Sequence, residues 1–121
     1  MAIITLENVD PVNIVPSQVG AALVVSVNGV QVGTIIDEFD PNPGVMKVFV
    51  QDLSSSAPVS AQWRSSSGGS WVPFTPARGG ATAEFTVPAA GAPDASFDLA
   101  ISAGGMQASP NPRLILRTKI K

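Results

Sequence analysis

The sequence contains no cysteine, no histidine and no tyrosine. Without cysteine the chain cannot form a disulfide bond or a thiolate metal site. Without histidine it lacks the commonest general base, metal ligand and pH switch, and a histidine-dependent catalytic triad is excluded. The ionisable groups that remain are nine carboxylates and seven lysines and arginines. Glycoside hydrolysis needs a pair of carboxylates that face each other, and the candidates are Asp52, Asp94 and Asp98. Nothing in their spacing along the sequence brings them together. The sequence therefore predicts a protein that is not an enzyme and that uses no metal or cofactor.

Charge and long apolar runs are also scarce. Charged residues make up 13% of the chain and the net charge is −2, so the sequence does not indicate a general binder of nucleic acids. No apolar run approaches the 18 residues that suggest a membrane-spanning helix. Residues 1–7 lack the basic and long apolar regions of a secretory signal, so we expect a protein made in the cytoplasm, without a membrane partner.

The two signs of charge are unevenly distributed. Residues 1–52 hold six acids and one base, whereas residues 113–121 hold four bases and no acid. This asymmetry is compatible with head-to-tail association, and also with two sheet ends that meet in one molecule. The second interpretation is the simpler one and is favoured.

Turn-forming residues and β-type patterns are abundant. The chain has 11 glycines and 11 prolines, and 45% of its residues are hydrophobic. Asn28-Gly29 separates two β-rich runs, 21–27 and 30–36, which is the strongest short hairpin signal in the chain. Other segments alternate between apolar and polar residues, as half-buried strands do. On this pattern further strands are predicted at 45–51, 59–64, 81–87, 96–102 and 113–121. Residues 3–6, Ile-Ile-Thr-Leu, are β-rich and are predicted to form an edge strand.

Two segments are predicted to lie outside regular strands. Residues 8–18 contain Pro11 and Pro16 and are expected to be extended or loop. Residues 37–44 combine acids with proline and are expected to form a solvated loop. The loop lacks the spacing of an EF-hand, so calcium is not predicted there.

The segment from Trp63 to Trp71 is predicted to be the central hairpin. With Gly68-Gly69 as the turn, Trp63 pairs with Phe74 on the core face and Trp71 lies beside Arg64 on the opposite face. Proline residues at 73 and 76 predict that the second strand is an edge strand.

The order of features from about residue 45 onward resembles bacterial and phage immunoglobulin-like or fibronectin type III-like modules. In such modules a strand ending in aspartate is followed by a tryptophan-bearing strand, a Gly-Gly-x-Trp hairpin and three closing strands. The matching segments are Val48-Phe49-Val50-Gln51-Asp52, Gln62-Trp63-Arg64, Gly68-Gly69-Ser70-Trp71, 82–87, 96–102 and 113–120. The cysteine pair and the tyrosine corner of many such domains are missing. Residues 1–44 add a hairpin that a seven-stranded sandwich does not need.

Together these patterns predict an all-β fold. We expect an antiparallel β-sandwich of eight or nine short strands, immunoglobulin-like, with a jelly-roll as the alternative. Residues 1–121 are expected to form a single β-sandwich domain in which residues 1–20 are an extended N-terminal arm or edge strand. Edge strands are expected to carry lysine, arginine and proline, which discourage edge-to-edge pairing.

The leading functional prediction is a non-catalytic structural or assembly module with protein partners or self-association. A virion component, such as a phage capsid decoration or tail accessory protein, is the kind of particle protein we expect. The alternative is a carbohydrate- or peptide-binding module, with Trp71 and Arg64 as the candidate surface contact. A second candidate is a row of bases on the last strand, interpreted mainly as an edge that keeps the protein soluble and secondarily as a phosphate track. This basic edge consists of Arg113, Arg117, Lys119 and Lys121.

Overall fold

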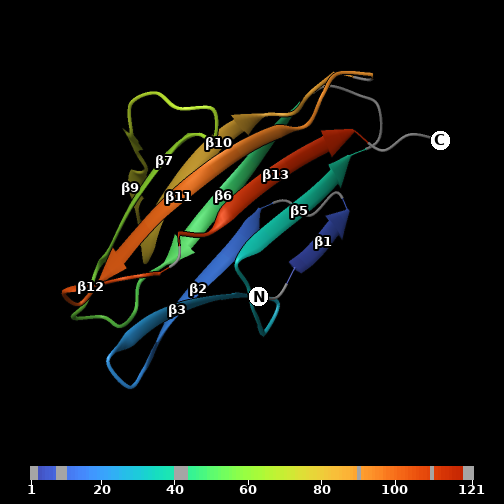
Figure 1. Ribbon diagram of the computed structural model, residues 1–121. Helices are drawn as coiled ribbons and strands as arrows, with labels where there is room; N and C mark the ends of the chain where they lie inside the picture. Colours follow the sequence, from blue (N-terminus) through green and yellow to red (C-terminus); the bar gives the residue numbers. More distant parts are fainter. Residues whose placement is uncertain (1–2, 8–10, 40–43, 90, 110, 119–121) are drawn as a thin grey trace.

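The computed structural model describes residues 3–7, 11–39, 44–89, 91–109 and 111–118. These residues form thirteen strands and no helix, so the all-β prediction is confirmed (Figure 1). Among them there is accordingly no helix of the length and hydropathy needed to cross a membrane. The strands are arranged in two sheets that lie one behind the other.

The larger sheet has seven strands in the order β1-β5-β13-β11-β7-β8, and β12 forms a hairpin with β11. The strand β1 therefore lies at one end of this sheet and β8 at the other. The bounds are β1 Ile3–Glu7, β5 Thr34–Phe39, β7 Val59–Ser65, β8 Val72–Pro73, β11 Ala95–Ala103, β12 Met106–Gln107 and β13 Arg113–Thr118.

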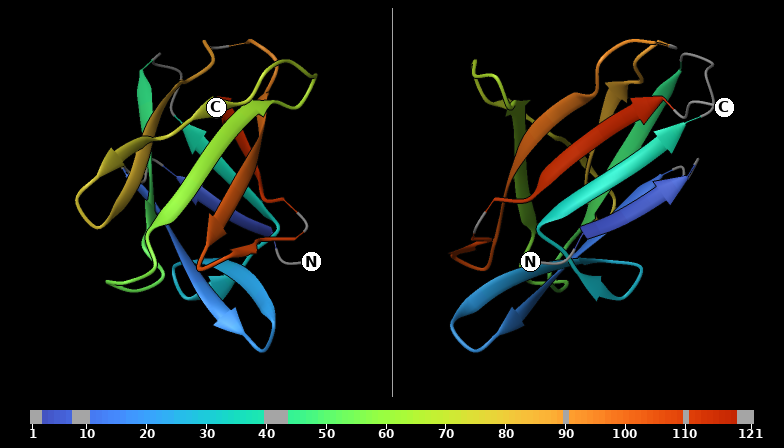
Figure 2. Two further views of the ribbon diagram at one scale, coloured as in Figure 1. Left: turned by 90° about the vertical axis from the view of Figure 1, so that its left-hand side faces the viewer. Right: turned by 45° about the vertical axis from the view of Figure 1, so that its right-hand side comes forward.

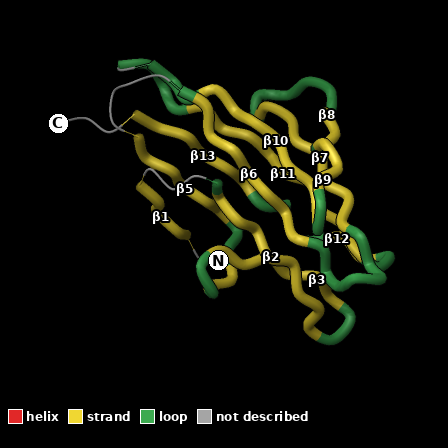
Figure 3. The backbone as a smooth tube through the Cα atoms, turned by 180° about the vertical axis from the view of Figure 1, so that it is seen from behind, coloured by secondary structure: helices red, strands yellow, loops and turns green. Residues whose placement is uncertain are grey.

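The smaller sheet has six strands in the order β4-β3-β2-β6-β10-β9. Figure 3 shows it from behind, with β2, β6 and β10 side by side. In Figures 1 and 2 the β2–β3 hairpin reaches beyond the rest of the molecule. The bounds are β2 Val12–Val19, β3 Ala22–Val27, β4 Val30–Gln31, β6 Val45–Gln51, β9 Thr75–Ala77 and β10 Gly80–Thr86.

Both sheets are mixed, which corrects the prediction of an antiparallel sandwich. The strand β5 runs parallel to both of its neighbours, β1 and β13, and β2 runs parallel to β6. Parallel neighbours must be joined by a crossover, because a tight hairpin can only produce antiparallel pairs. Here the crossovers pass from one sheet to the other, a feature that local sequence patterns do not reveal. The thirteen described strands also exceed the eight or nine expected, because four of them have only two or three residues.

The core lies between the two sheets. It is built by apolar residues that alternate along the strands, among them Met46, Val48 and Val50 of β6 and Leu114 and Leu116 of β13. The alternation predicted for these strands is therefore confirmed. Burial of such side chains is the main favourable contribution to folding.

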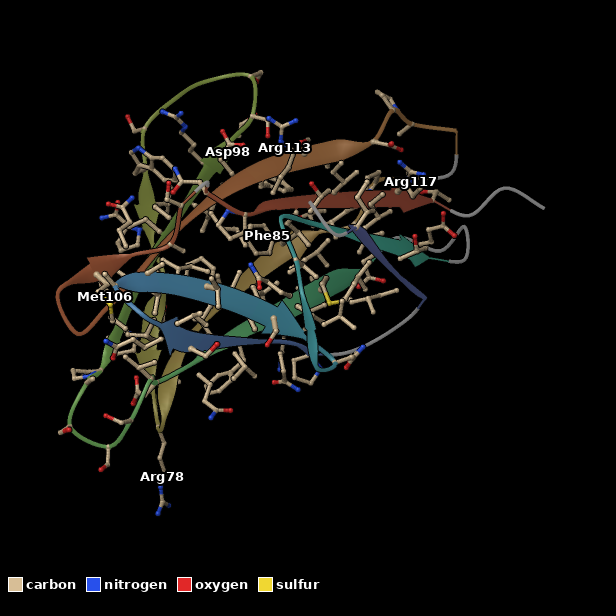
Figure 4. The ribbon with its side chains drawn as sticks, turned by 60° about the horizontal axis from the view of Figure 1, so that its bottom comes forward. Arg78, Phe85, Asp98, Met106, Arg113 and Arg117 are labelled. Atoms are coloured by element: carbon tan, nitrogen blue, oxygen red, sulfur yellow. The ribbon has the colours of Figure 1, made fainter. Side chains whose placement is uncertain are left out.

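One end of the core is aromatic. Phe85 of β10 contacts Trp63 and Phe97 of the facing sheet at ring-centroid distances of 5.2 and 4.8 Å, and Phe74 at 6.4 Å. Trp63 also meets Phe97 edge to face at 5.5 Å. Figure 4 shows Phe85 between the two layers. This cluster joins the two sheets, and it places Trp63 on the core face as predicted.

The register of the central hairpin differs from the prediction. Trp63 pairs with Val72 instead of Phe74, and the connection between the two strands occupies residues 66–71. Gly68 donates its N–H to the Ser65 carbonyl, so the tight turn begins at Ser65, two residues before the expected turn. The partner of Trp63 also shifts by two residues, an even number, so the paired strand residues keep the predicted face.

The Asn28-Gly29 hairpin is confirmed. Both residues have positive φ, 54° and 80°, as a two-residue turn between twisted strands requires. The strand that follows, predicted over 30–36, is in fact divided. The strand β4 ends at Gln31, and after Gly33 the chain enters β5 in the other sheet.

Three further segments differ from the prediction. The segment 8–18 was expected to be extended or loop; residues 8–10 lie outside the described residues, Pro11 forms a bend, and residues 12–18 belong to the regular strand β2. Pro16 lies in the portion of β2 that pairs only with β3, beyond the last residue paired to β6. Asp37, expected in a solvated loop, is a fully buried residue of β5, opposite Leu116. Residues 103–112 lie between two predicted strands, yet they contain β12, which is joined to β11 by two glycines with positive φ.

Candidate functional site

A row of four side chains crosses the outer face of the seven-stranded sheet near its β8 end. The ladder places Asp98 of β11 opposite Arg64 of β7 on one side and Arg113 of β13 on the other. The ion-pair distances from Asp98 are 3.6 Å to Arg64 Nε and 3.5 Å to Arg113 Nε. The Arg64 guanidinium lies 4.5 Å from the centre of the Trp71 ring, within the range of a cation–π contact. Figure 4 shows Asp98 and Arg113 close together on this face.

Two serines extend the row along the strands. Ser66 donates a hydrogen bond to Asp98 Oδ1 at 3.1 Å, and its Oγ lies 2.8 Å from Ser96 Oγ. A hydroxyl has one proton to donate, so Ser96 must be the donor between the two serines. The Ser66 N–H also bonds the Ser96 carbonyl. These contacts tie the start of the 66–71 connection to β11.

The energetic contribution of the row is small. The side chains of Arg64 and Arg113 are 40% and 54% exposed, and that of Asp98 is 20% exposed. Ion pairs with this exposure contribute about 0–1 kcal/mol each, because water screens them. The row therefore adds little to the stability of the fold, and it places charged, polar and aromatic groups side by side on the surface.

The predicted neighbours Trp71 and Arg64 are in contact. Trp71 is half-buried, with Arg64 over its ring. Whether they contact a ligand stays a prediction. The sequence did not identify Asp98 as the residue that links Arg64 to Arg113. The alternation placed Asp98 on the outer face, but the strand neighbours that make it central are set by tertiary pairing.

The prediction that the bases of the last strand lie on an edge strand is wrong. The strand β13 lies between β5 and β11, so it has neighbours on both sides. Arg117 pairs with Asp94 at 3.1 Å and with Glu38 at 3.8 Å, so its charge is already opposed by two acids. Arg113 pairs with Asp98, as described above. These pairs match the interpretation in which acids and bases meet within one molecule. Lys119 and Lys121 lie outside the described residues.

The carboxylates do not form a shared centre. Asp52 accepts a hydrogen bond from the Val59 N–H at 2.8 Å, Asp94 pairs with Arg117, and Asp98 pairs with Arg64 and Arg113. The part of the chain that the structure describes contains no group of three or more acidic side chains placed to hold a metal ion.

Exposed apolar side chains gather at the margins of the sheets. The most exposed is Ile3 of β1, at 64%. Val30 and Val72 lie on the terminal strands β4 and β8, and Val19 lies at the end of β2 beside a turn. Val45 does not follow this pattern, because it is exposed at the start of β6, which has a neighbouring strand on each side.

The described bases have the opposite distribution. Lys47, Arg64, Arg113 and Arg117 lie on strands that have neighbours on both sides, and Arg78 lies in the turn before β10, projecting away from the body in Figure 4. The expectation that edge strands carry lysine and arginine is therefore wrong for the described strands. The proline part is confirmed, because β8 and β9 contain Pro73 and Pro76. The strand β1 contains neither a base nor a proline.

A scan of the sequence against protein-family models gives no match, and no curated protein matches it.

Proposed function

We propose that the protein is a non-catalytic assembly module that joins copies of itself through the free edge of β1. The observation that carries the proposal is the character of this edge. The strand pairs with β5 on one side, and no described residue pairs with its other side. Ile3 and Thr5 of β1 are exposed, whereas Leu6 faces the core.

An unpaired edge offers a row of N–H and C=O groups to another strand. Proteins that must stay monomeric usually block such an edge with lysine, proline or a bulge. The other terminal strands here are two or three residues long, and two of them contain proline. The five residues of β1 have no such protection, so β1 is the edge best suited to pair with another chain.

The particle that we propose is a virion, in which the protein would serve as a capsid decoration or tail accessory protein. The proposal also includes a relationship to immunoglobulin-like modules, with the jelly-roll as the alternative. Support comes from the sequence resemblance, and from β6, β7, β10, β11 and β13 following one another in two facing sheets. An experimental structure of the assembled protein would test this relationship, because it would show both the topology and the contacts.

The assembly proposal is tested by static light scattering across a dilution series. We expect the wild-type mass to exceed that of one chain and to fall on dilution. Ile3→Lys should weaken association about tenfold or more, because losing one buried isoleucine costs about 1.5–3 kcal/mol and 1.4 kcal/mol is a factor of ten.

The matched control is Val45→Lys. Val45 is 51% exposed and lies on β6, an interior strand, so the same charge is added away from the proposed contact. The control should associate like the wild type. A wild-type protein that stays a monomer at every concentration would overturn the proposal, as would equal weakening by both substitutions.

A further inference from the structure

A second surface on the seven-stranded sheet has the chemistry of a ligand site. It is a hollow of ≈ 180 Å³ on the outer face of β7 and β11, next to β12. Its lining consists of Ser60, Gln62, Ala100, Ile101, Ser102 and Gln107. By this measure one water molecule needs about 10–15 Å³, so the hollow has room for several waters or for one small ring.

The ladder explains why these side chains converge. Ser102 of β11 is opposite Ser60 of β7 and opposite Gln107 of β12, so three polar side chains form one row. In the next row Gln62 lies between Ala100 and Pro73. The methyl group of Ala100 is short, so the sheet is hollowed between the longer side chains around it.

The polar lining is neutral and offers both donors and acceptors. Ser60 and Ser102 supply hydroxyl groups, and Gln62 and Gln107 supply amides. The Gln62 amide makes no hydrogen bond with any described residue, and the Gln107 amide makes only a long one, 3.5 Å to Asn111. Uncharged amides and hydroxyls can both donate and accept hydrogen bonds, so they suit an uncharged ligand that is rich in hydroxyl groups.

Apolar groups lie next to the hollow. The ring of Pro73 stands beside Gln62. Trp71 does not line the hollow; it lies with Arg64 in the next row along the sheet, and neighbouring rows on one face lie about 7 Å apart. An apolar ring beside convergent amides and hydroxyls matches a sugar, which has C–H groups on its faces and hydroxyls at its rim.

We infer that this hollow binds a single neutral sugar ring of a glycan, with Gln62 and Gln107 as the hydrogen-bonding residues and the Pro73 ring beside them. The site lies toward the β8 end of the sheet, whereas β1 is at the other end, so the inference does not depend on assembly through β1.

The test uses three neutral trisaccharides: maltotriose, cellotriose and N,N′,N″-triacetylchitotriose. Each is titrated into ¹⁵N-labelled protein while backbone and glutamine side-chain amide resonances are followed. At least one sugar should shift the resonances of residues 60–62 and 100–107 in a saturable manner. Gln62→Ala should weaken that binding about tenfold, because it removes one or two hydrogen bonds to the sugar. Ala100→Leu should abolish it by filling the hollow.

The matched control is Gln31→Ala, which removes an exposed glutamine from β4 in the other sheet and should leave binding unchanged. The inference is overturned if none of the three sugars shifts these resonances at saturating concentration. It is also overturned if a sugar binds but Gln62→Ala and Ala100→Leu, both shown to be folded by their spectra, bind it like the wild type. Light scattering on Ile3→Lys reports separately on assembly.

Discussion

Substitutions of Phe85 test whether the two sheets pack against each other, because this side chain lies between them. It is 3% exposed on β10 of the six-stranded sheet, and its ring contacts Trp63 and Phe97 of the seven-stranded sheet. Replacing it by alanine removes the ring that lies between the layers. Replacing it by leucine keeps most of the apolar volume but removes the aromatic contacts.

The expected magnitudes differ between the two replacements. A buried Phe→Ala change costs about 3–5 kcal/mol, from lost burial and from the cavity that remains. Aromatic pairs contribute about 0.5–1.5 kcal/mol each beyond burial, so Phe85→Leu, which loses the two close ones, should cost about 1–3 kcal/mol. Because small domains are stable by about 5–15 kcal/mol, the alanine variant should lose a large and easily measured part of the free energy of unfolding.

Urea unfolding followed by far-UV circular dichroism and tryptophan fluorescence measures these losses. Phe49→Ala is the control, because Phe49 is half-buried on the outer face of β6 and does not lie between the sheets. Its cost should be clearly smaller than that of Phe85→Ala. A loss below about 1 kcal/mol for Phe85→Ala, or equal losses for the two alanine variants, would refute the packing described above.

Two other substitutions test backbone features by the same unfolding measurement. Gly80→Ala should cost about 1–3 kcal/mol or more, because a Cβ there would run into the Val50 carbonyl oxygen and the Phe49 ring. Gly79→Ala, next to it, meets open space and carries only the strain of φ +82°, about 1–2 kcal/mol, so a larger loss at 79 than at 80 would contradict this reasoning. Asp52→Ala should cost about 1–3 kcal/mol by removing the acceptor for the Val59 N–H. Asp52→Asn, which keeps an oxygen, should cost less, and equal losses would show that the hydrogen bond contributes little.

Local features of the fold could be predicted from the sequence because they depend on neighbouring residues. The Asn28-Gly29 turn requires positive φ at two adjacent positions, and the residues themselves meet that requirement. The inward side chains of β6, β11 and β13 follow from a period of two. The period of two also predicted the sheet faces on which Trp63 and Trp71 lie. These faces are correct because the observed register differs from the predicted one by an even number of residues, two.

Non-local features could not be predicted in this way. The parallel pairing of β5 with β1 and β13 depends on which sheet the chain enters after Gly33. The burial of Asp37 depends on its position opposite Leu116, and an acidic residue before a proline-rich segment otherwise indicates a loop. The alternation of residues along β13 is the same in an edge strand and in an interior strand. The sequence therefore could not show that β13 is interior, and its bases were predicted to lie on an edge. The hollow beside Gln62 exists only because three strands bring short and long polar side chains into adjacent rows. The hairpin of β11 and β12 is an exception, because the Gly104-Gly105 pair before β12 is a local turn signal that can be recognised in the sequence.

Assembly through β1 is tested most directly by amide hydrogen exchange at low and high protein concentration. Exchange is slowed when an amide becomes hydrogen-bonded in a stable contact, and the measurement needs no assumption about the register of the pairing. We expect the amides of β1 to become more protected as concentration rises, while those of β4, the edge of the other sheet, do not change. Protection of β1 that is independent of concentration, or a rise confined to β4 or β8, would contradict the account.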